Sequence, residues 1–283
     1  MEKPSWVATV LTQVGLCFAM FLAFNLGKRD DGEPMWSTKK HRDLYFLSVR
    51  GGFRPLEQQN QLLEQMEKVA KLFKAKFVVN TSELGEDDPL MQNGTGHFPS
   101  LNIPWYTTSV SKGQTGAYFL KKIRVRYGKT MDIILLDTGS FQDPSSGRRI
   151  DLLLWLIRAL ERSMSKWCII VGFHSLAACD EHKDQMETKP FYELLHNVFL
   201  KFRVNAYLSG QECTNRSHGG TVPYIRYPSP LDKEPLAHNY DLLFESFSEM
   251  VSGFLLHRVS RLDIMTYFIS SSGQVIQRKF LQA

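Results

Sequence analysis

The sequence predicts an α/β protein in which mixed β-sheets are flanked by helices. Short apolar runs alternate with helix-like stretches from Leu44 to about Gly210, and consecutive short strands follow from about Val222. Such alternation, followed by strands alone, is typical of a sheet sandwich covered by helices. The 283 residues are 43% hydrophobic and 22% charged, which is ordinary for a globular chain and is enough for one large domain or two small ones.

The first strand and the first helix of the domain have strong patterns. The run LYFLSV, from Leu44 to Val49, is almost entirely apolar, as expected for a strand that is covered on both faces. A helix is predicted from about Leu56 to Lys74, because apolar residues recur there at spacings of three, four and seven. We expect this stripe to pack in the core, and it consists of Leu56, Leu63, Met66, Ala70 and Phe73.

The rest of the domain continues in the same way. KFVVNTS predicts a second strand, and the segment from Glu83 to Trp105 is predicted to be a loop because it is rich in Gly, Pro, Asp and Asn. Two strands are expected around Gly128-Lys129, and a helix from Ile150 to Arg162 should bury Leu153, Leu154, Ile157 and Leu160. The remaining predicted elements are the strand KWCIIVG, the helix FYELLHNVFLKF and the strands NAYLSG, GFLLHRVS, DIMTYFIS and GQVIQRKF.

The N-terminus predicts a membrane anchor. The stretch from Trp6 to Leu26 has no charged residue and would span roughly 30 Å as a helix, the thickness of a bilayer core. A cleaved signal peptide and a buried core helix remain as alternatives, although no A-x-A-like cleavage site precedes GKRDD. We therefore divide the chain into a signal-anchor (1–27), a polar linker (28–42) and a globular domain (43–283).

The orientation of the anchor is contested within the sequence. Basic residues are concentrated after the segment, which favours a cytosolic domain by the positive-inside rule. Three N-x-S/T sequons, at Asn80, Asn93 and Asn215, favour a lumenal or extracellular domain instead. Asn93 has the most loop-like context, whereas Asn80 closes a strand that is predicted to be buried. We expect a single-pass protein of the secretory pathway.

The charge argues against one class of partner, and the cysteine content leaves the redox state of the thiols open. The net charge is +5, and the basic clusters KKHR (39–42) and KKIRVR (121–126) have no accompanying nucleic-acid-reading motif, so we expect no nucleic-acid partner. Cys17 lies in the apolar segment, and Cys168, Cys179 and Cys213 form an odd set. This count allows either one disulfide with a free thiol or three reduced thiols.

The loops after the predicted strands resemble those of a known family. PWYTTSVSKG, DIILLDTGSF, WLIRALERSMSKWCIIVGFHS and AYLSGQEC occur in the order and setting of a metallophosphoesterase, and the match is closest to the small purple acid phosphatases of the tartrate-resistant type. The resemblance is strongest from Asp132 to Gly210 and weaker over the rest of Leu44 to the C-terminus. It implies a four-layer α/β/β/α sandwich with two metal ions at the strand ends. Such a pair, of Fe, Zn or Mn, polarises a phosphoryl group and supplies hydroxide.

The ligand positions that the resemblance implies are poorly filled. The G-D-W-G motif falls on VRGGF and the G-D-N-F-Y motif on SELGE, while the later motifs fall on VSKG, GFH and GQEC. Only Glu83 keeps an acid in the expected role, and Phe173 has no donor atom with which to replace a histidine. The corresponding positions are Gly51, Glu83, Glu86, Ser111, Phe173, Gln211 and Cys213. We therefore expect no catalytic residue and no metal cofactor.

Three functions follow from this pattern. The preferred one is a membrane-anchored, non-catalytic binding or scaffolding protein with a protein partner that the sequence does not identify. A second is a working phosphomonoesterase whose metal site is rebuilt from Glu83, Glu86, Asp87, His174, Glu212, Cys213 and His218. In the third, Lys112 and Arg50 hold a phosphorylated or anionic ligand by charge-assisted hydrogen bonds. Asp137, in LLDT, is expected to be a hydrogen-bonding residue at a strand end.

Overall fold

The computed structural model describes residues 43–108, 118–125, 128–141, 148–174, 189–210, 222–227 and 252–282, together with Gln13. The chain divides into two compact units, Met1–His41 and Arg42–Ala283, and all the elements described below belong to the second. Apart from Gln13, the predicted membrane segment and linker lie outside the described residues. Among the described helices, none combines the length and the apolar character needed to cross a bilayer.

The second unit contains two mixed β-sheets. The first has the strand order β11-β10-β9-β1-β2-β3, with β1, β2 and β3 parallel to one another and β9 antiparallel to β1. Its strands are β1 (Leu44–Arg50), β2 (Val78–Thr81), β3 (Trp105–Thr107), β9 (Gly253–Val259), β10 (Asp263–Ser270) and β11 (Val275–Gln282).

The second sheet has the order β4-β5-β6-β7-β8, in which β4 is antiparallel to β5 and the other neighbours are parallel. Its strands are β4 (Tyr118–Arg124), β5 (Thr130–Leu136), β6 (Trp167–Gly172), β7 (Ala206–Ser209) and β8 (Tyr224–Arg226).

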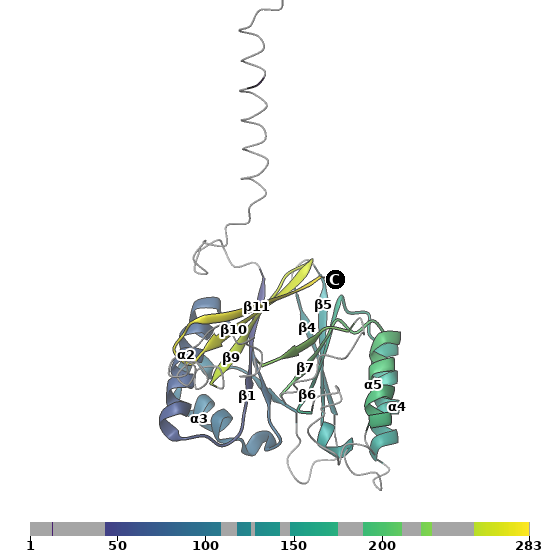
Figure 1. The fold of residues 1–283 in the computed structure, drawn as a ribbon, viewed down its shortest axis with the longest axis horizontal. Helices are drawn as coiled ribbons and strands as arrows, with labels where there is room; N and C mark the ends of the chain where they lie inside the picture. The colour runs from purple at the N-terminus through teal and green to yellow at the C-terminus, as the bar shows by residue number, and fades with distance from the viewer. Residues whose placement is uncertain are drawn as a thin grey trace, which may run out of the picture. The chain divides into compact units, whose positions relative to one another are not determined.

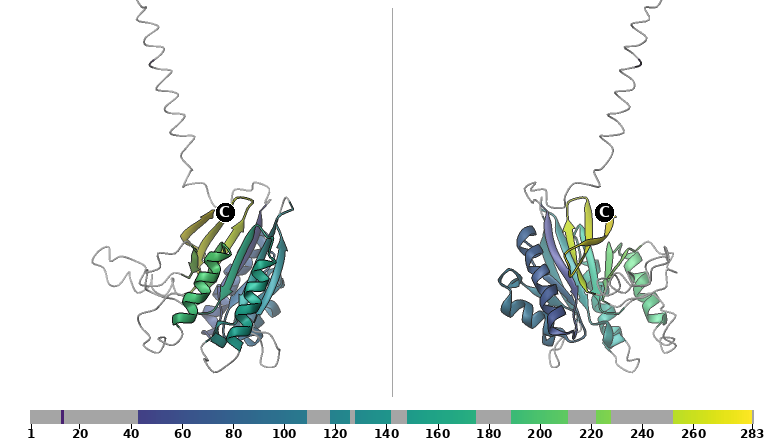
Figure 2. Two further views of the ribbon diagram at one scale, coloured as in Figure 1. Left: turned by 90° about the vertical axis from the view of Figure 1, so that its right-hand side faces the viewer. Right: turned by 60° about the vertical axis from the view of Figure 1, so that its left-hand side comes forward.

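Helices cover the outer face of each sheet. Figure 1 shows α2 (Leu56–Phe73) and α3 (Pro89–His97) beside the first sheet, and α4 (Arg148–Glu161) and α5 (Lys189–Lys201) beside the second. The turned views of Figure 2 show the same layers. Three short 3-10 helices complete the set: η1 (Gly85–Asp87), η2 (Pro99–Leu101) and η3 (Thr138–Phe141). The expected α/β sandwich with mixed sheets is therefore present.

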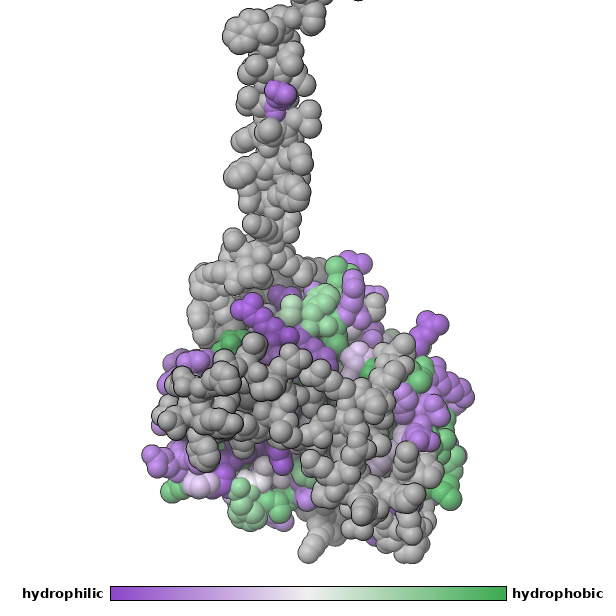
Figure 3. Space-filling model, in the orientation of Figure 1, coloured by the Kyte–Doolittle hydropathy of each residue, from purple (hydrophilic) through white to green (hydrophobic). Residues whose placement is uncertain are grey.

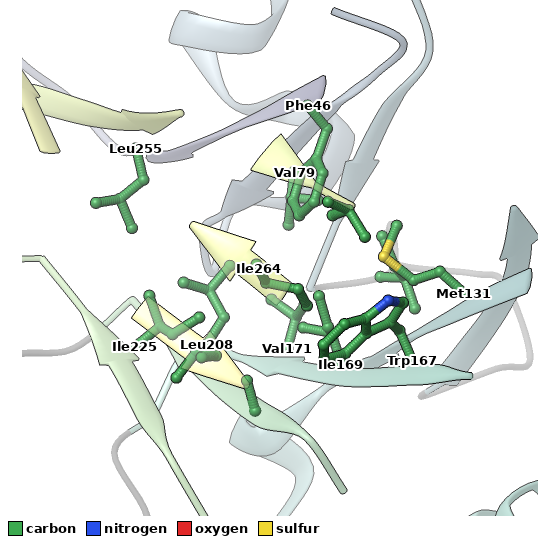
Figure 4. Packing of buried hydrophobic residues seen from close by; sticks show 14 of the residues in the cluster. Phe46, Val79, Met131, Trp167, Ile169, Val171, Leu208, Ile225, Leu255 and Ile264 are labelled. Atoms are coloured by element: carbon green, nitrogen blue, oxygen red, sulfur yellow. The ribbon is translucent and has the colours of Figure 1, made fainter. Parts of the chain in front are cut away.

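The two sheets face each other across a continuous apolar core. Alternate residues of each strand point into it, as the two-residue period of a strand requires. Figure 4 shows Phe46 and Val79 of the first sheet opposite Met131, Ile169 and Val171 of the second. The ring of Phe46 stacks on that of Phe77 at 4.7 Å. This packing fixes one sheet relative to the other, so that the loops at their common edge are held in place.

A second apolar cluster holds α4 and α5 against the second sheet. On α4 the buried row is Leu152, Leu156 and Leu160, at a spacing of four. The predicted stripe was partly wrong: Leu160 is buried and Leu153 and Ile157 are partly buried, but Leu154 is 46% exposed. The helix presents its 152–156–160 row to the sheet, and this turns Leu154 outward.

Two further expectations need correction. On α2 the predicted stripe is buried except for Leu56, which opens the helix and is 66% exposed. The segment from Glu83 to Trp105 is not simply a loop, because it contains α3 between η1 and η2. The Asp88 side chain begins α3 by accepting hydrogen bonds from the backbone N–H groups of Leu90 and Met91, and Pro89 occupies the first helical position.

The glycines of this segment favoured a loop prediction, yet α3 needs one of them, Gly94, in order to pack. A Cβ on Gly94 would lie 2.9 Å from Trp105 Cζ2, so only glycine allows α3 to pack this closely on β3. Asn93, for which a loop was expected, lies in α3 and is partly exposed. Asn80 is fully buried in β2. The other predicted strands and helices of the described residues are confirmed.

Candidate functional site

The ends of several parallel strands meet at one edge of the sandwich. Gly51 follows β1 and donates its N–H to the Thr81 carbonyl at the end of β2, 3.2 Å away. Gly210 follows β7 in the other sheet, and a Cβ there would lie 2.9 Å from Thr81 and 3.1 Å from Phe173. The carboxyl ends of strands from both sheets therefore come together, as the strand-end loops of the sequence predict. Binding sites in such folds are built at this edge.

A glutamate and a histidine face each other at this edge. Glu83 Oε1 lies 3.4 Å from His174 Nε2. On the other side of the ring, His174 Nδ1 lies 2.9 Å from Thr138 Oγ1, which also accepts the His174 backbone N–H. Burial lowers the pKa of His174, while the charges of Glu83 and Asp137 oppose that shift. Burial thus favours the neutral imidazole, with Nδ1 engaged by Thr138 and Nε2 directed toward the carboxylate.

A small cavity of about 130 Å³ adjoins this pair. Asp137 lies in its wall and accepts a hydrogen bond from the Gly139 N–H at 3.1 Å, so the expectation of a hydrogen-bonding residue at this strand end is confirmed. The Tyr207 hydroxyl donates to the His174 carbonyl at 2.6 Å and so fixes the loop after β6. The cavity is lined by Ser82, Glu83, Thr108, Asp137, Gly139, Phe173 and His174.

The position expected for the first metal-ligating aspartate is filled from elsewhere in the chain. A Cβ on Gly51 would lie 2.2 Å from Asp88 Oδ2 and 2.5 Å from Asn80 Oδ1. Asp88 is fully buried, and its Oδ2 accepts the Gly52 N–H at 2.7 Å while its Oδ1 caps α3. The space beside β1 is thus occupied by a carboxylate whose two oxygens both accept backbone hydrogen bonds.

The described residues do not fit a pair of metal ions. Gly51 offers no donor, Phe173 places an apolar ring edge-on to His174 at 5.1 Å, and the Nδ1 of His174 is already used. Nowhere in the part of the chain that the structure describes do three or more His, Cys, Asp or Glu side chains lie close enough to hold one ion. A two-metal centre needs a bridging carboxylate and several further donors.

The remaining predicted residues are dispersed. Glu86 and Asp87 are exposed in η1, and neither lines the cavity beside Glu83 and His174. Arg50 ends β1 beside this site, and its carbonyl accepts a hydrogen bond from Arg54 Nη2 at 2.6 Å. The others lie outside the described residues: Ser111, Lys112, Cys179, Gln211, Glu212, Cys213, Asn215 and His218. Cys168 is a buried free thiol, and burial raises its pKa to about 12, so it stays protonated.

Sequence reasoning missed two residues that shape this site. Asp88 was not among the predicted site residues, and only its place before Pro89 carried a signal, since Asp followed by Pro is a common helix start. Thr138 carried no signal of its own, because its contact with His174 joins loops after two different strands.

Comparison with solved structures agrees with this architecture. The chain has a metallophosphoesterase-like fold. Over 85% of its length it superposes on 89% of GAP50, described as the anchor in the inner membrane complex of Plasmodium, with a TM-score of 0.58 and 16% sequence identity.

Two other structures are much less similar, each at 10% identity over 85% of this chain. They are a predicted phosphoesterase from Streptococcus pneumoniae (98% of that chain, TM-score 0.35) and a phosphatase from Mycoplasma pneumoniae (93% of that chain, TM-score 0.37). No protein-family model matches the chain, and no curated protein shows significant similarity to it.

Proposed function

We propose that this chain is a membrane-anchored, non-catalytic binding or scaffolding protein built on a metallophosphoesterase-like domain. The observation that carries the proposal is the filled ligand position: the buried carboxylate of Asp88 occupies the space beside Gly51. No room is left beside Gly51 for a further donor side chain, and this supports a non-catalytic role. GAP50, which shares the fold, is described as an anchor in a membrane complex, and this supports a scaffolding role on the same framework.

A second candidate is an active phosphomonoesterase with an altered metal site. It is favoured by one observation, the pairing of Glu83 with His174 beside a cavity of about 130 Å³. Two donors are fewer than a pair of cations requires, so we rank this function below scaffolding.

Metal content and hydrolysis separate the two functions. We expect the full-length protein, purified in mild detergent, to hold far less than one transition-metal equivalent. With a generic aryl phosphate at acidic or neutral pH, we also expect no chelator-sensitive phosphatase activity. The Glu83→Gln variant separates the two functions, since it should leave a non-enzymatic background rate unchanged but lower turnover by a site that uses Glu83. About two tightly held equivalents with chelator-sensitive turnover would establish the enzyme instead.

We further propose that the anchored domain faces the lumen or the cell exterior, as the sequons suggest. Asn93 is partly exposed on α3, whereas Asn80 is fully buried. In a eukaryotic expression host we expect a glycosidase-sensitive mass shift that is reduced by Asn93→Gln. We expect none to remain in an Asn93→Gln/Asn215→Gln variant, since Asn80 is inaccessible. If wild type shows no shift, the domain does not enter the lumen.

A further inference from the structure

A groove between α4 and β4 lies at the other end of the second sheet from the site. Its floor includes Asp132, near the start of β5, whereas Asp137 and His174 follow the ends of β5 and β6. Figure 2 shows α4 running along the sheet beside the edge strands. The groove has a volume of about 370 Å³, within the range of ligand-binding clefts.

The floor and walls of the groove are largely apolar. Trp155 of α4 stacks on Tyr118 of β4 with ring centroids 4.0 Å apart, which holds the indole in place. Leu120 is 37% exposed and Ala159 is partly exposed beside it. Ordered apolar walls of this kind are suited to receive an aliphatic or aromatic side chain from a ligand.

Three cations surround the groove. Lys122 on β4, Arg158 in the last turn of α4 and Arg162 directly after its end are all exposed, and the Arg162 N–H donates to the Arg158 carbonyl at 3.2 Å. None of the three forms an ion pair or a side-chain hydrogen bond with another residue in the described part of the chain. Their charge is therefore available to a ligand.

Only one acid lies among the lining residues. Asp132 is 1% exposed, and its two carboxylate oxygens accept hydrogen bonds from the hydroxyls of Ser163 (2.6 Å) and Ser165 (2.7 Å). One buried, hydrogen-bonded carboxylate does not balance three exposed cations, so the groove keeps a net positive charge. Figure 3 shows hydrophilic and hydrophobic residues next to one another at the edge where α4 and α5 lie.

We propose that this groove binds an acidic segment of a partner protein, with an aliphatic side chain seated on Trp155 and carboxylates paired with Arg158, Arg162 and Lys122. The cations are spread over a helical turn and across to the strand, which suits an extended chain with several carboxylates. Guanidinium groups bind carboxylates through paired hydrogen bonds. The inference rests on the scaffolding proposal for its biological role. It does not depend on whether the strand-end site binds metal, so the groove proposal and the scaffolding proposal can be refuted by different experiments.

The test uses the full-length protein in mild detergent and a fluorescein-labelled peptide in which glutamates flank a pair of leucines. We expect saturable binding by fluorescence anisotropy, weakened by salt, and no comparable binding of the same peptide with glutamine in place of glutamate. The double variant Arg158→Glu/Arg162→Glu should weaken binding at least about tenfold. Its melting temperature, measured alongside, reports whether the fold is intact.

The matched control is Lys71→Glu, which reverses an exposed cation in the last turn of α2, just as Arg158 lies in the last turn of α4. It should leave peptide binding unchanged. The proposal is overturned if the glutamate peptide does not bind saturably, if the glutamine peptide binds equally well, or if Lys71→Glu weakens binding as much as the double variant. It is also overturned if the soluble lipid headgroup glycerophosphoserine displaces the labelled peptide as readily as unlabelled peptide does, since the groove would then bind lipid headgroups.

Discussion

Replacing Gly51 with aspartate is expected to lower the free energy of unfolding by about 4 kcal/mol and to create no metal site. The new side chain would begin 2.2 Å from Asp88 Oδ2 and 2.5 Å from Asn80 Oδ1. Two carboxylates would then compete for one buried space, and moving Asp88 would remove the cap of α3 and the acceptor of the Gly52 N–H. Chemical denaturation measures the loss, and metal analysis of the purified variant gives a second readout.

Two alanine variants separate the causes of that loss. Gly51→Ala introduces the crowding without the charge, and it should cost about 2 kcal/mol. Gly96→Ala is the matched control, because a Cβ there meets no atom within 4 Å and the residue lies in α3, where alanine is preferred. It should be neutral or slightly stabilising. A Gly51→Asp variant as stable as wild type, or one that gains bound metal, would show that the space beside β1 is free.

The space beside Gly51 is not an empty cavity. If a ligand is only replaced by a smaller residue, a cavity remains, and restoring the side chain can restore the site. Here the start of α3 occupies the volume beside Gly51, and three backbone N–H groups donate to the Asp88 carboxylate. The carboxylate now serves to hold α3 against the β1 loop. A metal ligand beside Gly51 would require α3 to begin differently, because Asp88 both caps this helix and accepts the Gly52 N–H.

The sequence predicted those parts of the fold whose signal is local. β1 and β6 are covered on both faces, so their apolar runs were readable without knowledge of their neighbours. α2 carried a stripe at helical spacing and was found almost to the residue. The gathering of strand ends at one edge was expected from the order of the loops, and the contact between Glu83 and His174 agrees with it.

What the sequence did not predict depends on contacts between distant segments. α3 has a composition typical of loops, and it is helical because Asp88 caps it and Gly94 lets it pack on Trp105. The contact of Asp88 with the Gly51–Gly52 backbone joins residues 36 positions apart, which no local pattern reveals. On α4, the run of six consecutive apolar residues at 152–157 left the inward row ambiguous until the sheet fixed it.

A buried hydrogen-bonded trio crosses the first sheet and could be mistaken for catalytic machinery. Ser48 Oγ lies 2.8 Å from His257 Nε2, and His257 Nδ1 lies 2.9 Å from Thr266 Oγ1. All three residues are at most 3% exposed, and the imidazole stacks on Phe46 at 4.4 Å. No substrate reaches Ser48, so the trio satisfies the polar groups of three adjacent strands, β1, β9 and β10, inside the sandwich.

The stability of the domain is expected to fall by about 2 kcal/mol between pH 6 and pH 4.5 because of His257 alone. Burial lowers the pKa of His257 from 6.5 to about 3. Below pH 6.5 the unfolded chain therefore binds a proton that the folded protein does not, and acid favours the unfolded state. The contribution approaches about 1.4 kcal/mol per pH unit until the folded pKa is reached. Urea denaturation at a series of pH values measures this slope.

The difference between two variants assigns the slope to His257. His257→Gln keeps a polar side chain between Ser48 and Thr266 but cannot be protonated. The slope of its stability against pH should therefore be smaller than that of wild type, by the contribution of about one bound proton. Thr266→Val is the control: it removes one hydrogen bond and lowers stability at every pH, but it leaves the ionisable ring in the core and should keep the wild-type slope.

His174, whose pKa burial also lowers, adds a contribution of the same sign to the slopes of wild type and of both variants, so it cancels in the comparison. Equal slopes for wild type and His257→Gln would mean that the ring takes up a proton in the folded state, and the sandwich core at His257 would then be accessible to water.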